Sequence, residues 1–152
     1  MRAVIQRVTL ASVSIDGVVR GQIGHGFVVL FAAGAEDTAD LIEPFWAKME
    51  RLRIFADQEG KTNLSLSQVE GEILLIPQFT LYANARRGNR PSFTEAARPE
   101  EGEALFEAIK EIAHATFPGK VQWGVFGADM QVELVNDGPF TVILDSKTLF
   151  KS

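Results

Sequence analysis

The chain has 152 residues, of which 46% are hydrophobic and 23% are charged, and its formal net charge is −5. A chain of this length can bury a hydrophobic core without disulfides, and we expect residues 1–152 to form a single domain. The sequence contains no cysteine, which excludes disulfide bonds and a thiolate nucleophile. The negative net charge excludes a general nucleic-acid coat, so contact with RNA would require a local basic patch.

The N-terminal residues do not form a targeting signal. Arg2 and Arg7 enclose only a very short apolar stretch, unlike the apolar region of a signal peptide. The longest apolar run, 27–33, is far too short to span a bilayer. We therefore expect a cytoplasmic protein without a membrane partner.

The first predicted elements are strands. Ala11, Val13 and Ile15 alternate with polar residues, which is the pattern of a half-buried strand, and Asp16-Gly17 follows as a turn. Residues 27–31 form a continuous apolar run between glycines, which predicts a central strand.

The next element is a predicted helix. Apolar residues recur at helical spacing from Leu41 to Leu52. Asp37 or Thr38 is expected to cap its N-terminus. A proline inside a helix costs roughly 3 kcal/mol, so we expect the helix either to kink at Pro44 or to begin there.

The middle of the chain predicts a strand, a loop and a second helix. Residues 73–76 form another buried strand candidate, and a polar, arginine-rich loop follows over 84–91. The helix should begin at Pro99, with acidic residues in its first turn, and end at Pro118-Gly119. Its predicted apolar face consists of Leu105, Phe106, Ile109, Ile112 and Ala113.

The C-terminal part is predicted to be β-structure again. Met130, Val132 and Leu134 alternate with polar residues, and residues 140–144 are expected to return as the second strand of a hairpin after the turn 136–139. Strands at both ends with two helices between them predict an α+β fold. We expect mostly antiparallel or mixed sheets in a barrel-like or sandwich arrangement, flanked by two main helices.

The usual catalytic side chains do not occur in recognisable patterns. His25 and His114 are isolated and have no metal-ligand spacing, so we expect no metal and no cofactor. The sequence has no G-x-S-x-G elbow, P-loop or G-x-G-x-x-G loop. An enzyme with this sequence would have to use backbone dipoles, hydroxyls, amides or groups of its own substrate.

The segment 77–81 is the first candidate site, because it directly follows a strand expected to be fully buried. Pro77 cannot donate to a sheet ladder, so the next N–H groups can face a ligand, and a pair of such groups is what an oxyanion hole requires. From the residues alone, an ordinary strand end with a buried Phe79 and a hydrogen-bonded Thr80 is the favoured alternative.

Two further segments carry polar or conformationally special residues. Arg86, Arg87 and Arg90 lie in one loop, and arginine forks suit phosphate groups, although a solvated loop explains them equally well. Residues 136–139, Asn-Asp-Gly-Pro, are typical of a hairpin turn, and local physics does not predict a cis bond before the proline.

Two motifs carry a family resemblance: Pro-Gln-Phe-Thr-Leu at 77–81 and Asn-Asp-Gly-Pro-Phe-Thr at 136–141. Together with further matching segments, they resemble the D-aminoacyl-tRNA deacylase family nearly from end to end. These further segments are 1–8, 52–55, 63–66, 82–83, 90–93 and 126–135. Pro77 departs from the family motif S-Q-F-T-L, and a related group of deacylases with a different stereochemical tolerance has P-Q-A-T there.

The resemblance implies hydrolysis of the ester bond between a D-amino acid and the 3′ end of its tRNA. If the side chain of an L-amino acid collides with the backbone of the site, L-aminoacyl-tRNA should be rejected, and mischarged glycyl-tRNA, which has no side chain, should be hydrolysed. Gln78, Phe79 and Thr80 would be the catalytic residues, with the backbone amides of Phe79 and Thr80 facing the ester carbonyl. The protein would be a homodimer in which a cis Gly138-Pro139 hairpin tip, fixed by Arg7, enters the site of the partner.

Three other functions remain open. Pro77 could shift the stereospecificity of a deacylase toward mischarged L-substrates. A non-catalytic RNA-binding module would explain the arginine loop and the missing catalytic side chains. A metalloenzyme is the least favoured, because no cluster of ligands is visible.

Overall fold

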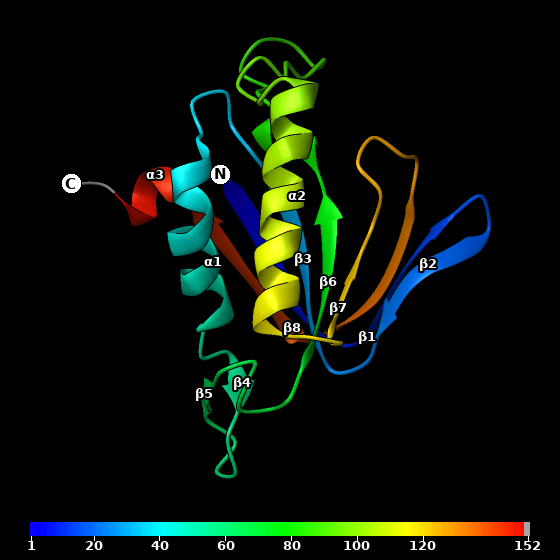
Figure 1. Ribbon diagram of the computed structural model, residues 1–152, viewed down its shortest axis with the longest axis vertical. Helices are drawn as coiled ribbons and strands as arrows, with labels where there is room; N and C mark the ends of the chain where they lie inside the picture. Colours follow the sequence, from blue (N-terminus) through cyan, green and yellow to red (C-terminus); the bar gives the residue numbers. More distant parts are fainter. Residues whose placement is uncertain (151–152) are drawn as a thin grey trace.

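The computed structural model describes residues 1–150 (Figure 1). Its strands, helices and 3₁₀-helices (η) are β1 Arg2–Ile15, β2 Val18–Ile23, β3 Gly26–Ala32, η1 Ala39–Leu41, α1 Ile42–Glu50, β4 Phe55–Ala56, β5 Thr62–Leu64, β6 Glu72–Pro77, η2 Phe79–Tyr82, α2 Pro99–Thr116, β7 Val121–Trp123, β8 Gln131–Asp145 and α3 Ser146–Leu149. No helix among these residues is long and apolar enough to cross a membrane.

A mixed sheet that curls on itself forms the main body of the fold. β1 pairs antiparallel with β2, β3 and β8, whereas β6 pairs parallel with both β3 and β7. The sheet nearly closes where β7 approaches β2, and a Cβ on Gly21 would lie only 3.1 Å from the Cβ of Gln122. The predicted α+β fold, with a mixed, barrel-like sheet and two main helices, is confirmed.

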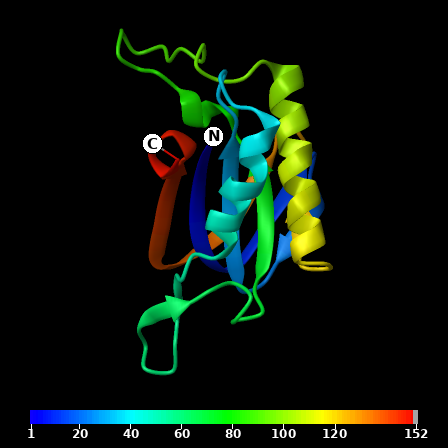
Figure 2. The same cartoon turned by 60° about the vertical axis from the view of Figure 1, so that its left-hand side comes forward.

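Buried side chains lie on both faces of this sheet. α1 and α2 lie side by side over one face (Figures 1 and 2), and their buried residues include Phe45 and Phe106. A second buried group, which includes Val28 and Leu74, lies on the opposite face. Because β3 and β6 are covered on both faces, they can be apolar at nearly every position, and both predicted central strands are confirmed.

The first helix begins differently from the prediction. α1 starts two residues before Pro44, so the proline lies in the first turn, where its missing N–H breaks no helical hydrogen bond. The predicted cap is wrong, because α1 follows Leu41 directly and Thr38 makes no capping hydrogen bond before η1. The carboxylate of Asp37 instead accepts a hydrogen bond from the Gly34 N–H at 2.6 Å.

The second helix agrees with its prediction. α2 begins at Pro99 with two glutamates in its first turn and ends at Thr116, two residues before Pro118. Leu105, Phe106 and other predicted face residues are buried against the sheet. The proline start and the regular apolar spacing are therefore reliable signals here.

The predicted C-terminal hairpin is wrong. β8 is one continuous strand, and both of its halves pair with β1, so the chain does not turn back after Asn136. Val8 pairs with Asn136 and Gln6 pairs with Thr141, which leaves the residues between Asn136 and Thr141 projecting as a bulge. Turn-forming residues suit a bulge as well as a hairpin, and the partner strand decides between them. The Asp16-Gly17 turn, by contrast, is confirmed, with positive φ at both residues.

Candidate active site

The end of β6 leaves two backbone donors free. The N–H of Gln78 donates to the carbonyl of Phe31 at 2.8 Å, and η2 begins at the next residue. The first N–H groups of a helix have no acceptor inside that helix. Within residues 1–150, the N–H groups of Phe79 and Thr80 accordingly make no hydrogen bond. The Phe79 side chain is 56% exposed, so the favoured alternative, an ordinary strand end with a buried Phe79, is wrong, and the start of η2 is open to solvent.

The polar side chains beside these donors contact each other. The side-chain amide of Gln78 donates to the hydroxyl of Thr80, and the Thr80 proton remains available for another acceptor. Within residues 1–150, neither side chain bonds to a histidine or a carboxylate. His25 packs against Phe55 and His114 against Trp123, so neither belongs to this site.

An apolar pocket of about 360 Å³ adjoins η2. Its lining residues are Pro77, Phe79, Phe93, Ala96, Ala97, Pro99, Phe126 and Gly127. The rings of Phe79 and Phe93 meet edge to face, with their centroids 5.2 Å apart. The sequence did not single out Phe93 or Phe126 as site residues; the only signal was an aromatic residue within a polar or glycine-flanked segment.

The Gly138-Pro139 bulge is held from inside the fold. The peptide bond between these residues is cis, as the resemblance implied. Arg7 donates from Nε to the carbonyl of Asp137 at 3.0 Å and from Nη1 to the carbonyl of Ile54 at 2.7 Å. Its guanidinium also lies 4.6 Å from the centre of the Phe140 ring. Arg7 therefore ties the base of the bulge to the segment before β4.

Asn136 stabilises the bulge by bonding to the two residues that follow Pro139, a role that was not predicted from the sequence. Its Oδ1 accepts a hydrogen bond from the Phe140 N–H at 2.9 Å, and its Nδ2 donates to the Thr141 hydroxyl at 3.1 Å. An asparagine before a turn-forming segment is a weak signal for such a contact, since asparagine often bonds to nearby backbone.

The two motifs lie at opposite ends of the sheet. Arg7, beside the bulge, pairs with Phe27 at the start of β3, whereas Pro77, before η2, pairs with Phe31 near the end of that strand. Four residues of strand span about 13 Å. A single chain therefore does not bring Gly138-Pro139 to the free amides of η2.

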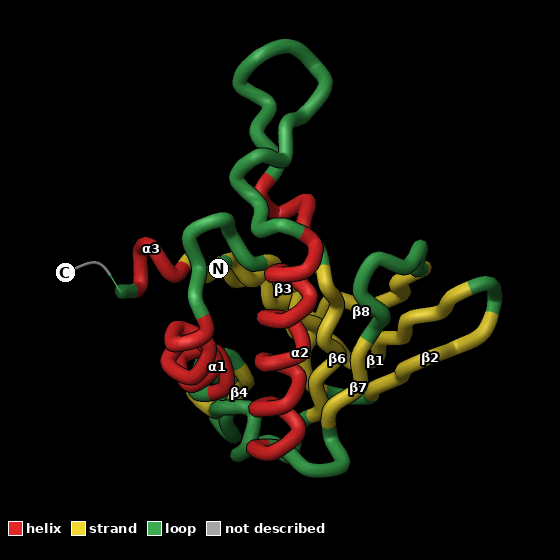
Figure 3. The backbone as a smooth tube through the Cα atoms, turned by 45° about the horizontal axis from the view of Figure 1, so that its top comes forward, coloured by secondary structure: helices red, strands yellow, loops and turns green. Residues whose placement is uncertain are grey.

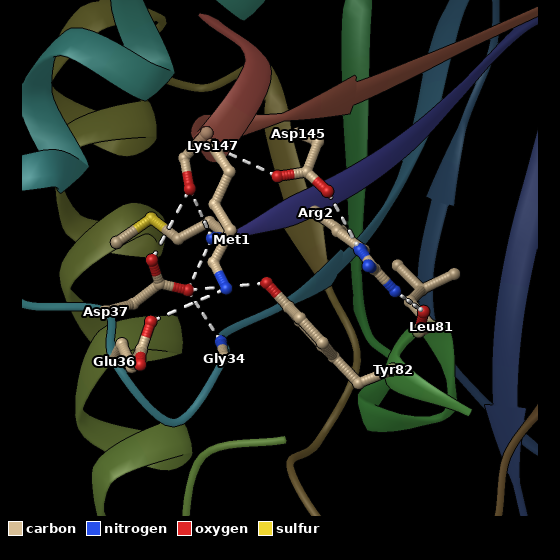
Figure 4. A network of polar contacts seen from close by, with 10 residues as sticks. Met1, Arg2, Gly34, Glu36, Asp37, Leu81, Tyr82, Asp145 and Lys147 are labelled. Atoms are coloured by element: carbon tan, nitrogen blue, oxygen red, sulfur yellow. Dashed lines mark hydrogen bonds and ion pairs between the residues drawn. The ribbon is translucent and has the colours of Figure 1, made fainter. Parts of the chain in front are cut away.

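A network of polar contacts holds the last two residues of η2, Leu81 and Tyr82 (Figure 4). The Tyr82 hydroxyl contacts a carboxylate oxygen of Asp37 at 3.4 Å. Arg2 donates to the Leu81 carbonyl at 2.9 Å, and its guanidinium lies 4.4 Å from the centre of the Tyr82 ring. Burial and the nearby charge of Asp37 raise the pKa of Tyr82, so its hydroxyl stays protonated at neutral pH. Tyr82 thus anchors η2 and does not serve as a base.

The loop that carries Arg86, Arg87 and Arg90 stands out from the body of the protein (Figure 3). All three side chains are exposed, and none forms an ion pair within residues 1–150. No group of three histidine, aspartate or glutamate side chains in the same part of the chain could hold a metal ion.

Residues 4–145 match the family model described as D-Tyr-tRNA(Tyr) deacylase. The match, together with a fold that offers free backbone amides and no paired base, defines a hydrolase of the ester bond in aminoacyl-tRNA. The chain belongs to the D-Tyr-tRNA(Tyr) deacylase family.

Two solved structures are similar to this chain over nearly its whole length. One, described as c-Myc DNA Unwinding Element Binding Protein, is 40% identical, with a TM-score of 0.91 over 96% of this chain and 99% of that chain. The other, described as a probable eukaryotic D-amino acid tRNA deacylase, is 18% identical, with a TM-score of 0.80 over 94% of this chain and 97% of that chain. At that identity, the second structure supports the fold alone.

Proposed function

We propose that this deacylase releases D-amino acids and glycine from tRNA and leaves L-aminoacyl-tRNA intact. The observation that carries the proposal is the pair of unbonded N–H groups on Phe79 and Thr80 at the open start of η2. Such a role amounts to chiral quality control of translation, so we propose that the enzyme acts in the cytoplasm.

The free amides would act as the oxyanion hole. When water attacks the ester carbonyl, negative charge develops on its oxygen, and two backbone donors stabilise that charge without reorganising. Gln78, Thr80 or the 2′-hydroxyl of the terminal ribose would position the water. No histidine or carboxylate bonds to Gln78 or Thr80 within residues 1–150, which favours help from the substrate's own hydroxyl.

The adjoining apolar pocket would bind the terminal adenine. Bases of single-stranded RNA stack on aromatic side chains, and Phe79, Phe93 and Phe126 line this pocket. An adenine held there would keep the ester next to the η2 amides, since Phe79 belongs to both features.

Stereochemical selection would come from the bulge of a second copy of the chain. The carbonyl oxygens of Gly138 and Pro139 would accept hydrogen bonds from the α-amino group of the substrate. With the amino group and the ester fixed, a D side chain points to solvent, whereas an L side chain collides with the backbone. Glycine has no side chain to collide, so glycyl-tRNA would also be hydrolysed.

Two observations support a homodimer. The bulge and the η2 amides lie at opposite ends of β3, so a site built from both would need two chains. Within residues 1–150, β8 pairs only with β1, and it exposes Val135 (49%) and Ile143 (72%). A long edge strand with exposed apolar side chains is suited to pairing with another chain.

The first experiment is deacylation of matched D-tyrosyl-tRNA and L-tyrosyl-tRNA by the purified protein. We expect loss of the D-ester with the L-ester intact. Loss of both esters would contradict the collision model, and Pro77→Ser would then show whether Pro77 relaxes the selectivity. Binding of both substrates without hydrolysis would support a non-catalytic RNA-binding module.

A second experiment isolates one backbone donor. Phe79 is the first residue of η2, a position that accepts proline. Phe79→Pro removes both the ring and the N–H, whereas Phe79→Ala removes only the ring. We expect kcat of the proline variant to fall about 100- to 1,000-fold below that of the alanine variant. Equal kcat values in two folded proteins would rule out the Phe79 amide as an oxyanion donor.

A further inference from the structure

A second, polar pocket of about 480 Å³ opens directly after η2. Its lining residues are Arg2, Ala83, Asn84, Ala85, Arg86 and Glu95. Two guanidinium groups and one carboxylate line it. Arg2 is ion-paired with Asp145, whereas Arg86 forms no ion pair within residues 1–150, so Arg86 is the cation left for a bound anion. The roles proposed above for the η2 amides, the apolar pocket and the bulge do not use this pocket.

Arg2 is held rigidly at the edge of this pocket. Its Nε donates to Asp145 at 3.0 Å and its Nη1 to the Leu81 carbonyl at 2.9 Å, while the Tyr82 ring lies against the guanidinium. Its side chain is still 36% exposed, and no hydrogen bond within residues 1–150 uses Nη2. A guanidinium that is fixed yet has a free donor loses little entropy when it binds an anion.

Arg86 provides the second cation from the base of the arginine loop. Its backbone N–H donates to Oδ1 of Asn84 at 3.0 Å, a local turn that fixes where the loop leaves the pocket. The charge of Arg86 has no carboxylate partner within residues 1–150. Glu95 also lines the pocket, and its carboxylate accepts a hydrogen bond from Nδ2 of Asn84 at 3.5 Å.

We propose that this pocket binds a phosphodiester group of single-stranded RNA, next to the terminal adenosine of the substrate. The inference rests on the proposed function, which assigns the ester to the η2 amides. Thr80 and Ala83 are three residues apart, which is about 6 Å along a 3₁₀-helix. An RNA end whose ester reaches Thr80 therefore brings its neighbouring phosphates to Arg2 and Arg86, and arginine forks match phosphate oxygens.

The three arginines of the loop are expected to differ in their contribution to RNA binding. Arg86 lines the pocket, whereas Arg87 and Arg90 follow it in the sequence and are not among the lining residues. Arg86 should therefore contribute most to binding of the RNA end. Arg2 is unsuitable as a test variant, because its substitution would also release the Leu81 carbonyl and disturb η2.

The test compares two substrates that share the ester but differ in phosphate: D-tyrosyl-tRNA and 3′-O-D-tyrosyl-adenosine. For Arg86→Gln, we expect KM for the tRNA to rise about tenfold, the effect of one charged contact, with kcat unchanged. Both constants for the adenosine ester should stay at the parent values. Glu95→Gln should lower KM for the tRNA only, because it removes the opposing charge.

The matched control is Arg51→Gln, which removes an arginine that is 77% exposed at the far end of α1. It should leave both substrates unaffected. The salt dependence of tRNA affinity should also become shallower in Arg86→Gln, by a slope of about 0.7 for one single-strand contact.

Two results would overturn the inference: an unchanged KM for tRNA in Arg86→Gln, or equal changes for the two substrates. Failure of the proposed function looks different, because the parent protein would then hydrolyse neither the tRNA nor the adenosine ester.

Discussion

At the scale of single residues, the site depends on side chains that hold backbone in place. Arg7 and Asn136 both bond to the bulge, and Gln78 bonds to Thr80 beside the free amides. Pro77 marked the end of the strand, but the free amides arise from the start of η2, because the N–H of Gln78 still bonds to Phe31. The role of Asn136 was not predicted, because an asparagine before a turn-forming segment is only a weak signal for bonds to nearby residues.

We predict that Asn136 controls stereoselectivity through the bulge. Asn136→Asp keeps the acceptor for the Phe140 N–H, whereas Asn136→Leu loses both the acceptor and the donor to Thr141. The leucine variant should lose about 1–2 kcal/mol of unfolding free energy and much of its D-over-L preference. Urea unfolding and the ratio of kcat/KM for the two tyrosyl-tRNAs measure these effects. Equal ratios for the two variants and the parent would contradict the role.

Asp145 gives a prediction about pH. Partial burial alone would raise the pKa of its carboxyl group, but hydrogen bonds from the Lys147 N–H and from Arg2 outweigh burial and lower it below 3.8. A lowered folded-state pKa stabilises the fold above the ordinary pKa, and this stabilisation is lost as the pH falls through the folded value. Asp145→Asn should therefore cost up to about 1 kcal/mol at neutral pH, a limit set by its solvent exposure. Urea unfolding across the acid range should show the difference from the parent disappearing; a constant difference would contradict it.

At the scale of elements, the sequence predicted single strands and helices from their apolar patterns, but it did not predict which strands pair with each other. The apolar runs of β3 and β6 and the spacing in α2 led directly to those elements. The segment 136–139 has the chemistry of a tight turn, but pairing of both flanks with β1 turned it into a bulge. The aromatic pocket beside η2 could also not be predicted from the sequence, because its lining residues come from several separate segments.

The position of η2 provides the prediction at this scale. A Cβ on Gly34 would lie 2.8 Å from the Tyr82 hydroxyl oxygen and 3.1 Å from Oδ2 of Asp37. Gly34→Ala should therefore displace Tyr82 and η2, lowering kcat and costing about 1–3 kcal/mol of stability. Thermal unfolding and D-tyrosyl-tRNA kinetics measure both effects.

The control for this prediction is Gly102→Ala in α2. There the new Cβ would meet Phe126 at an ordinary 3.4 Å, and replacing glycine within a helix stabilises by about 0.5–1 kcal/mol. If Gly34→Ala were as stable and as active as the parent, close packing behind η2 would not matter for the site.

At the scale of the whole molecule, the proposed site needs one part from each of two chains. The sequence contains both motifs, but it cannot show that they lie at opposite ends of the same strands. The pairing of Arg7 with Phe27 and of Pro77 with Phe31 establishes this separation.

Mixing two variants that each damage one of these parts should therefore restore activity on D-tyrosyl-tRNA. Phe79→Pro damages the amide side, and Gly138→Ala damages the bulge, since its φ is +135° and the new Cβ would lie 3.1 Å from Arg7. After co-refolding, half of the dimers should be mixed and have one intact site each, giving about a quarter of the parent rate in a symmetric dimer. Deacylation of D-tyrosyl-tRNA measures the recovery. No recovery from chains that demonstrably form mixed dimers would mean that both parts act within one chain.

If the site is built from two chains as proposed, the distance between the bulge and the free amides also determines at which concentrations the protein is active. A newly synthesised monomer would carry two half-sites and no complete one, so it would be inactive until it formed a dimer. At concentrations below the dimer dissociation constant, the rate should rise with the square of the chain concentration. The cell could then adjust the activity through the amount of the protein alone, without any bound regulator.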